Sequence, residues 1–184
     1  WTEVNEVNTG RNSFGGTGSS TAGLITSGEI PSVTAKTESW DGTNWTEVAD
    51  LNTAGKARIT IGTYTSALAV GGSTAAGAPF YAIVEQYDGS SWTEIADLNT
   101  GRGEGAATGT SALGLAFGGE NPSAVAITEF WNGTSWTEVA DLGTAVGNSA
   151  GAGTSSAGLS FAGQAPGITA ATEEFTAVDF QIKS

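Results

Sequence analysis

Acidic side chains recur at two fixed positions along this 184-residue chain, and paired carboxylates are the groups here that could do chemistry. Two carboxylates suffice for glycoside hydrolysis, and carboxylate oxygens are ligands for calcium. A catalytic pair needs two unlike environments, whereas regular repetition gives alike ones, and no Asp-x-Asp-x-Asp loop occurs. We therefore expect a solvated acidic rim with no catalytic residue, no metal site and no cofactor, calcium being the one ion that the acidic excess permits. The two series are Glu3, Glu47, Glu94, Glu138 and Glu6, Asp50, Asp97, Asp141.

The composition excludes several other activities. The chain has no His, Cys or Met, so it holds no Ser-His-Asp or Cys-His centre and no zinc site built from those residues. Its 19 acidic and 6 basic residues give a net charge of −13, which argues against nucleic acid and anionic membranes as partners. No apolar run approaches the roughly 18 residues of a membrane helix, so we expect no membrane insertion.

Four segments of variable sequence carry the remaining candidate binding residues. The second is three residues longer than the others and contains Phe80 and Tyr81, an aromatic pair that has no counterpart elsewhere. Together with Glu29 and Asn121, these residues are our candidate binding site. The alternative is a loop that packs onto the strands it connects. The segments are 29–35, 73–82, 120–126 and 164–170.

An internal repeat must position all of these residues. The motif Trp-Thr-Glu-Val/Ile begins at positions 1, 45, 92 and 136, so the steps are 44, 47 and 44 residues. Within the third unit, apolar and turn residues predict four short strands and no helix. Pairs of aromatic residues five positions apart, such as Trp131 and Trp136, flank a turn and should face each other across two strands. The predicted strands are 103–109, 112–117, 124–131 and 135–141.

Units of about 45 residues with four strands each are typical of propeller blades. We predict one all-β domain over 1–184, a four-bladed β-propeller with four antiparallel strands per blade. Residues 1–7 should close the ring by pairing with the last blade near Thr172 to Phe175, which leaves 176–184 as a tail with Phe180 and Ile182. The variable segments then lie on one rim, where repeat proteins diversify for binding. The repeats are approximately 1–44, 45–91, 92–135 and 136–179.

The repeat resembles the kelch repeat, in which an apolar strand ends in a Gly pair that an aromatic residue and then a Trp follow. Gly71-Gly72 with Tyr87 and Trp92 carry this pattern, as do Gly118-Gly119 with Trp131 and Trp136. The resemblance implies a propeller and covers essentially the whole chain. The amino-acid sequence of the repeats is also similar to that of repeats in phage virion and tail-associated proteins.

The chain departs from the kelch pattern in places. The first and fourth pairs are Ser27-Gly28 and Ala162-Gly163. An Arg that often follows the outer strand is present as Arg11 and Arg102 but replaced by Gly55 and Val146. These departures argue against carrying over a family binding surface.

From these features we expect a non-enzymatic structural or interaction module with other protein chains as partners, on a virion or elsewhere outside the cell. The alternative is a glycan-binding receptor-recognition module that uses the rim loops.

Overall fold

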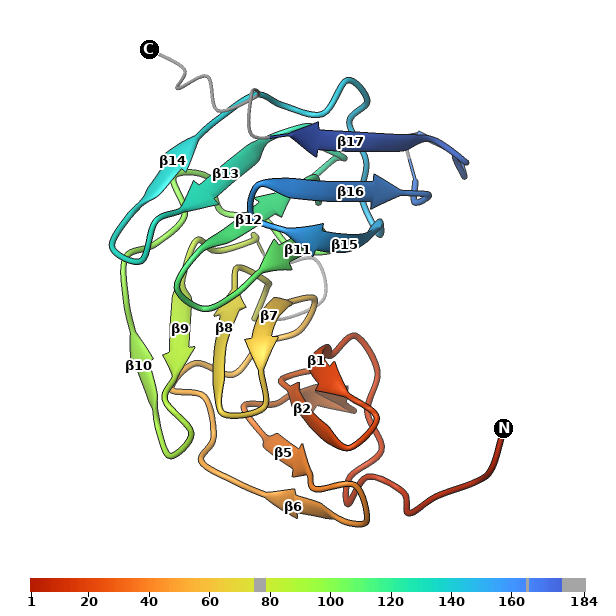
Figure 1. The fold of residues 1–184 in the computed structure, drawn as a ribbon, viewed down its shortest axis with the longest axis vertical. Coiled ribbons are helices and arrows are strands. Elements are labelled where there is room, and N and C mark those ends of the chain that lie inside the picture. The colour runs from red at the N-terminus through yellow and green to blue at the C-terminus, as the bar shows by residue number, and fades with distance from the viewer. Residues whose placement is uncertain (75–78, 165, 177–184) are drawn as a thin grey trace.

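The computed structural model describes residues 1–74, 79–164 and 166–176, and in this part it contains strands and no helix. Four antiparallel sheets are arranged around a common axis as the blades of a propeller (Figure 1). Accordingly, the described part of the chain has no helix that could span a membrane. The predicted all-β class and four-bladed arrangement are confirmed.

Each blade follows the same strand order from the axis outward. Blade 1 contains β1 (Gly15–Ser19), β2 (Ala22–Thr26), β5 (Thr37–Trp40) and β6 (Trp45–Glu47). Blade 2 contains β7 (Ile59–Thr63), β8 (Ser66–Val70), β9 (Val84–Tyr87) and β10 (Trp92–Glu94). Blade 3 contains β11 (Ala106–Gly109), β12 (Gly114–Phe117), β13 (Thr128–Trp131) and β14 (Trp136–Glu138). Blade 4 contains β15 (Ala150–Thr154), β16 (Ala157–Phe161) and β17 (Thr172–Thr176), and β3 (Glu29–Ile30) pairs with β4 (Ser32–Val33) within a loop of blade 1.

The aromatic pairs hold the two outer strands of each complete blade together. Trp131 is directly opposite Trp136 in the β13–β14 register, with ring centroids 5.3 Å apart. Tyr87 and Trp92 are 5.0 Å apart in blade 2, and Trp40 and Trp45 are 5.4 Å apart in blade 1. The predicted cross-strand pairing is therefore confirmed in these three blades.

Small residues let the inner strands approach one another at the axis. A Cβ added to Gly15 of β1 would lie 2.0 Å from Thr60 Oγ1 of β7. The inner strand of blade 2, β7, has larger side chains but fits the same scheme. Its Ile59 and Ile61 pack against Gly105 and Gly114 of blade 3. A large side chain on one blade is thus matched by a glycine on the next.

The Gly pair that ends the second strand has two different conformational requirements. Its first residue has φ near 60°, which Ser27 and Ala162 adopt at 60° and 58°. Its second residue is always glycine, with φ of 104° at Gly119 and 111° at Gly163. A Cβ on Gly119 would also lie 2.6 Å from the carbonyl oxygen of Gly103. The backbone therefore requires glycine only at the second position.

Replacing Gly119 by alanine should lower the free energy of unfolding by about 1–3 kcal/mol, the cost of a strained backbone conformation. The matched replacement Ala162→Gly relieves a left-handed residue and should change stability little. Urea denaturation of both variants measures the difference, and equal stabilities would contradict this account of the Gly pair.

The predicted pairing of residues 1–7 with the last blade is not formed. Residues 1–7 belong to no strand, and blade 4 has three strands in the part of the chain that is described. The physical reason is that the segment is held by blade 1, where Asn5 Nδ2 donates to Thr43 O (2.8 Å) and to Asn44 Oδ1 (2.9 Å). The N-terminus consequently lies across an opening from β17 (Figure 1). Most of the predicted tail, 177–184 with Phe180 and Ile182, falls outside the described residues.

Main-chain hydrogen bonds around the axis show the same opening. Ala57 N donates to Ser13 O (2.8 Å), Glu104 N to Ala57 O (3.0 Å) and Asn148 N to Glu104 O (2.6 Å). These bonds join blade 1 to blade 2, blade 2 to blade 3, and blade 3 to blade 4. Within the described residues, no corresponding bond joins blade 4 to blade 1.

Candidate functional site: buried ion pairs and the loop rim

A glutamate at the second position of the third strand links each blade to the segment that enters it. In blade 3, Glu129 is fully buried and accepts hydrogen bonds from Asn99 N (2.8 Å) and Asn99 Nδ2 (2.7 Å). Arg102 Nη1, also fully buried, lies 2.5 Å from Glu129 Oε1, and Arg102 Nη2 donates to Ala116 O (3.0 Å). We call this arrangement of a buried glutamate, an Asn-Thr segment and an arginine the latch.

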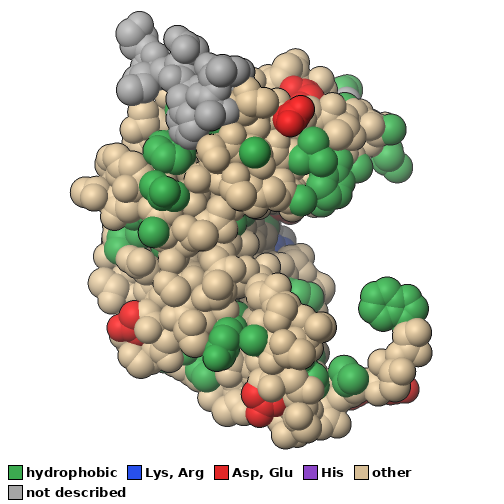
Figure 2. Space-filling view, viewed as in Figure 1, with side chains coloured by type: hydrophobic (Ala, Val, Ile, Leu, Met, Phe, Trp, Pro, Cys, Tyr) green, Lys and Arg blue, Asp and Glu red, His purple; other side chains and the backbone are tan. Residues whose placement is uncertain are grey.

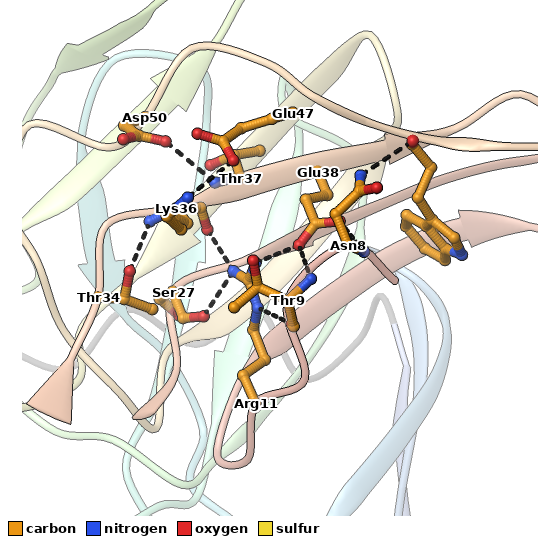
Figure 3. Close-up of polar contacts among 11 residues, drawn as sticks. Asn8, Thr9, Arg11, Ser27, Thr34, Lys36, Thr37, Glu38, Glu47 and Asp50 are labelled. Atoms are coloured by element: carbon orange, nitrogen blue, oxygen red, sulfur yellow. Dashed lines mark hydrogen bonds and ion pairs between the residues drawn. The ribbon is translucent and has the colours of Figure 1, made fainter. Parts of the chain in front are cut away.

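The same latch occurs in blade 1 (Figure 3). Asn8 N donates to Glu38 Oε2 (2.7 Å), and Arg11 forms an ion pair with the other carboxylate oxygen. Arg11 Nη1 also donates to Ser27 O (3.2 Å) and to Lys36 O (2.6 Å). The N-terminal segment is thus anchored to blade 1 just as the later connecting segments are anchored to theirs.

In blade 2 the arginine comes from another sequence position. Gly55 stands where Arg11 and Arg102 stand in their units, but Arg58 Nη2 reaches Glu85 Oε1 at 3.2 Å with both side chains fully buried. A Cβ on Gly55 would lie 1.9 Å from Tyr81 Oη, so the tyrosine occupies the space near the usual arginine position. The arginine is absent at Gly55, as the sequence shows, and Arg58 supplies the cation from three residues later.

Blade 4 keeps the glutamate but not the arginine. Glu173 accepts hydrogen bonds from Gly143 N (2.5 Å) and Thr144 N (2.9 Å). Val146, which is buried, stands at the arginine position. The fourth latch is therefore held by main-chain donors without an ion pair from this position.

Glu47, Asp50 and Asp141 of the two acidic series make structural contacts. In the outer strand of blade 1, Glu47 forms an exposed ion pair with Lys36 at 2.8 Å. In the second series, Asp50 accepts from Thr37 N (3.3 Å) and Asp141 from Thr128 N (3.1 Å), which ties the end of an outer strand to the strand beside it. Among the described residues, no three His, Cys, Asp or Glu side chains gather where they could hold a metal ion.

The aromatic pair of the candidate site is turned toward the propeller. Tyr81 Oη accepts a hydrogen bond from Arg58 Nε (3.1 Å), and the guanidinium carbon lies 5.1 Å from the centre of the ring. Burial raises the pKa of the Tyr81 phenol, an effect that the nearby Arg58 opposes. Phe80 is half-buried, and a Cβ on Gly103 would lie 2.7 Å from its ring. The Tyr81 side chain thus contacts the segment that enters blade 2, and Phe80 contacts the segment that enters blade 3.

Glu29 and Asn121 lie on other loops of the same rim. Glu29 Oε2 forms an ion pair with Lys56 Nζ at 2.7 Å, between the loop of blade 1 and the segment that enters blade 2. Asn121 is exposed and precedes Pro122 in the loop of blade 3. The four predicted residues therefore share a rim but belong to three different blades, and no contact described here brings them together.

A hollow on this rim was not predicted from the sequence. It lies between the loops of blades 3 and 4 and is lined in part by Glu120, Ser123, Thr144 and Gln164. Burial, followed by the nearby Glu104 carboxylate, raises the pKa of Glu120. The sequence feature that pointed to this hollow was Asn121, which is next to Glu120 in the same loop.

No family model matches the chain, and no curated protein matches it. The resemblance to kelch repeats and to phage proteins accordingly rests on the repeat residues alone. The fold itself is independent of that resemblance, because it follows from the strand order and pairing. The chain is a four-bladed β-propeller of antiparallel strands.

Proposed function

We propose that this propeller is a non-enzymatic structural or interaction module that joins other protein chains in a larger assembly. The observation that carries the proposal is that its buried charged side chains form structural ion pairs. The most deeply buried glutamates and arginines of blades 1 to 3 tie each blade to the segment that enters it. Sequence variation, in contrast, is concentrated in the rim loops, where a partner would be recognised.

The location of this assembly belongs to the same proposal. The Gly pairs and Trp positions support a kelch-like module. The similarity of the repeat sequence to phage proteins supports a virion or tail-associated protein. A net charge of −13 keeps a particle surface apart from other acidic surfaces. We therefore place the module on a virion or elsewhere outside the cell.

Cross-linking mass spectrometry of the native assembly tests the proposal. Lys56 lies on the rim beside Glu29, so an amine-reactive cross-linker should join it to a lysine of another polypeptide. Lys36, on the connection to β5, is the matched control because its exposed pair with Glu47 lies on the outer strand. Cross-links of Lys56 that stay within its own chain would contradict a rim interface.

The second candidate is glycan recognition at the hollow between blades 3 and 4. It is favoured by the polar side chains Glu120, Ser123 and Gln164, which offer hydrogen-bond donors and acceptors to sugar hydroxyls. A glycan array probed with the whole chain distinguishes the candidates. Saturable binding that Gln164→Ala abolishes and Asn132→Ala leaves intact would establish the glycan-binding alternative; no binding would exclude it for the glycans on the array.

A further inference from the structure

Blade 4 has a cavity where the complete blades have a tryptophan. The cavity is about 130 Å³ and lies between β17, β16 and the segment that follows β14. Its walls include Ala140, Leu142, Gly158, Ser160 and Phe175.

The corresponding position in blade 2 is filled by Trp92 of the outer strand β10. Trp92 is buried, and its Nε1 donates to Ala49 O (3.1 Å). Trp136 is buried in the same position of blade 3, without that hydrogen bond. The residues around Trp92 are Ala49, Leu51, Ala67, Ala69 and Tyr87, which are the repeat counterparts, in order, of the five cavity residues. The cavity is thus a tryptophan site of the repeat.

A strand with the required sequence is present and exposed. Trp1-Thr2-Glu3 matches β10 and β14, and Trp1 is the most exposed large hydrophobic residue described. The residues after it also match the connecting segments of the complete blades, since Asn8 Nδ2 donates to Trp45 O as Asn52 Nδ2 does to Trp92 O. Residues 1–3 therefore have the sequence of an outer strand, the one expected for the blade that would precede blade 1 around the axis.

Anchoring to blade 1 directs this strand away from its own blade 4. Asn5 is bonded to Thr43 and Asn44, so Trp1 lies within four residues of this anchor and at most about 14 Å from it. They project from the body on the other side of the opening, with hydrophobic side chains at their end (Figure 2). The strand is thus placed for insertion into another molecule.

We propose that Trp1–Glu3 of one copy adds to β17 of a second copy, with the Trp1 indole in the cavity of blade 4. The exchange pairs an extended segment with a sheet and fills a side-chain site, as in other strand-addition complexes. It is head-to-tail, so each copy has one strand to give and one site to fill. This inference deepens the proposed assembly function by naming a second copy of the chain as a partner.

Two complementary variants test the exchange on the full chain. Trp1→Ser removes the donor but leaves the site open, whereas Ser160→Phe fills the site but leaves the donor. We expect the unmodified chain to associate with rising concentration in light scattering, and each variant to weaken association about 30-fold or more. An equimolar mixture of the two variants should form dimers, because one donor and one open site remain. Leu113→Ser, at another exposed hydrophobic residue, is the control and should associate normally.

Circular dichroism must show that both variants fold. The proposal is overturned if Trp1→Ser associates as strongly as the unmodified chain, which would make another segment, such as Phe180–Ile182, the occupant. It is equally overturned if the mixture stays monomeric, or if the unmodified chain is a monomer with its own Trp1 shielded from a fluorescence quencher. These outcomes leave the assembly function intact, because the Lys56 cross-links to other polypeptides test that function separately.

Discussion

Replacing Glu129 by glutamine should lower the free energy of unfolding by about 3–5 kcal/mol, the cost of leaving one partner of a buried ion pair uncompensated. Both Glu129 and Arg102 have fully buried side chains, so water cannot solvate the Arg102 cation once its partner charge is lost. Chemical denaturation measures the loss. The substitution conserves side-chain volume, so the effect reports the charge and its hydrogen bonds rather than a cavity.

Glu173→Gln is the matched control for this experiment. Glu173 holds the equivalent position in blade 4 but is half-buried and accepts from two main-chain amides, with Val146 at the arginine position. We expect a loss of about 1 kcal/mol, typical of a hydrogen-bond deletion. The paired change Arg102→Met with Glu129→Leu should recover the part of the loss that comes from the uncompensated charge, but not the part that comes from Asn99 N losing its acceptor. Equal losses at Glu129 and Glu173 would show that the ion pair has no special role.

Truncating Trp136 to alanine should cost about 3–5 kcal/mol, the range for large aromatic residues in a core. Trp136 is 5 % exposed and belongs to the largest hydrophobic cluster, with Ile59, Ile61 and Trp131. The truncation also removes the ring that faces Trp131 across the β13–β14 pair. Thermal and urea unfolding should both show the effect.

Trp1→Ala is the control, because the same residue type in the same sequence motif is fully exposed in the single molecule. At protein concentrations too low for association, it should leave stability unchanged. A large loss in the dilute monomer would mean that Trp1 closes its own ring, as the sequence predicts and the structure does not show.

Local signals in the sequence determined the blades. The turn residues and the aromatic residues five positions apart indicate which strands pair, and the observed register puts Trp131 opposite Trp136. The strands are shorter than predicted, since β13 begins at Thr128 rather than at 124. The glycine after each second strand was also readable, because its requirement lies in the φ angle of a single residue.

The contacts between blades were decided by the tertiary structure. Arg102 and Glu129 are 27 residues apart, and nothing in the local pattern shows that an arginine entering a blade meets a glutamate on its third strand. Arg58 replaces the expected cation because Tyr81 occupies the space beside Gly55, a relation between two separate loops. The same is true of the opening: the motif of Trp1 identifies it as an outer strand, but the blade that receives that strand depends on where Asn5 and Asn8 are anchored. Backbone conformation and strand pairing arise from neighbouring residues, whereas the contacts between a blade and the segment that enters it arise from side chains that only the packed fold brings together.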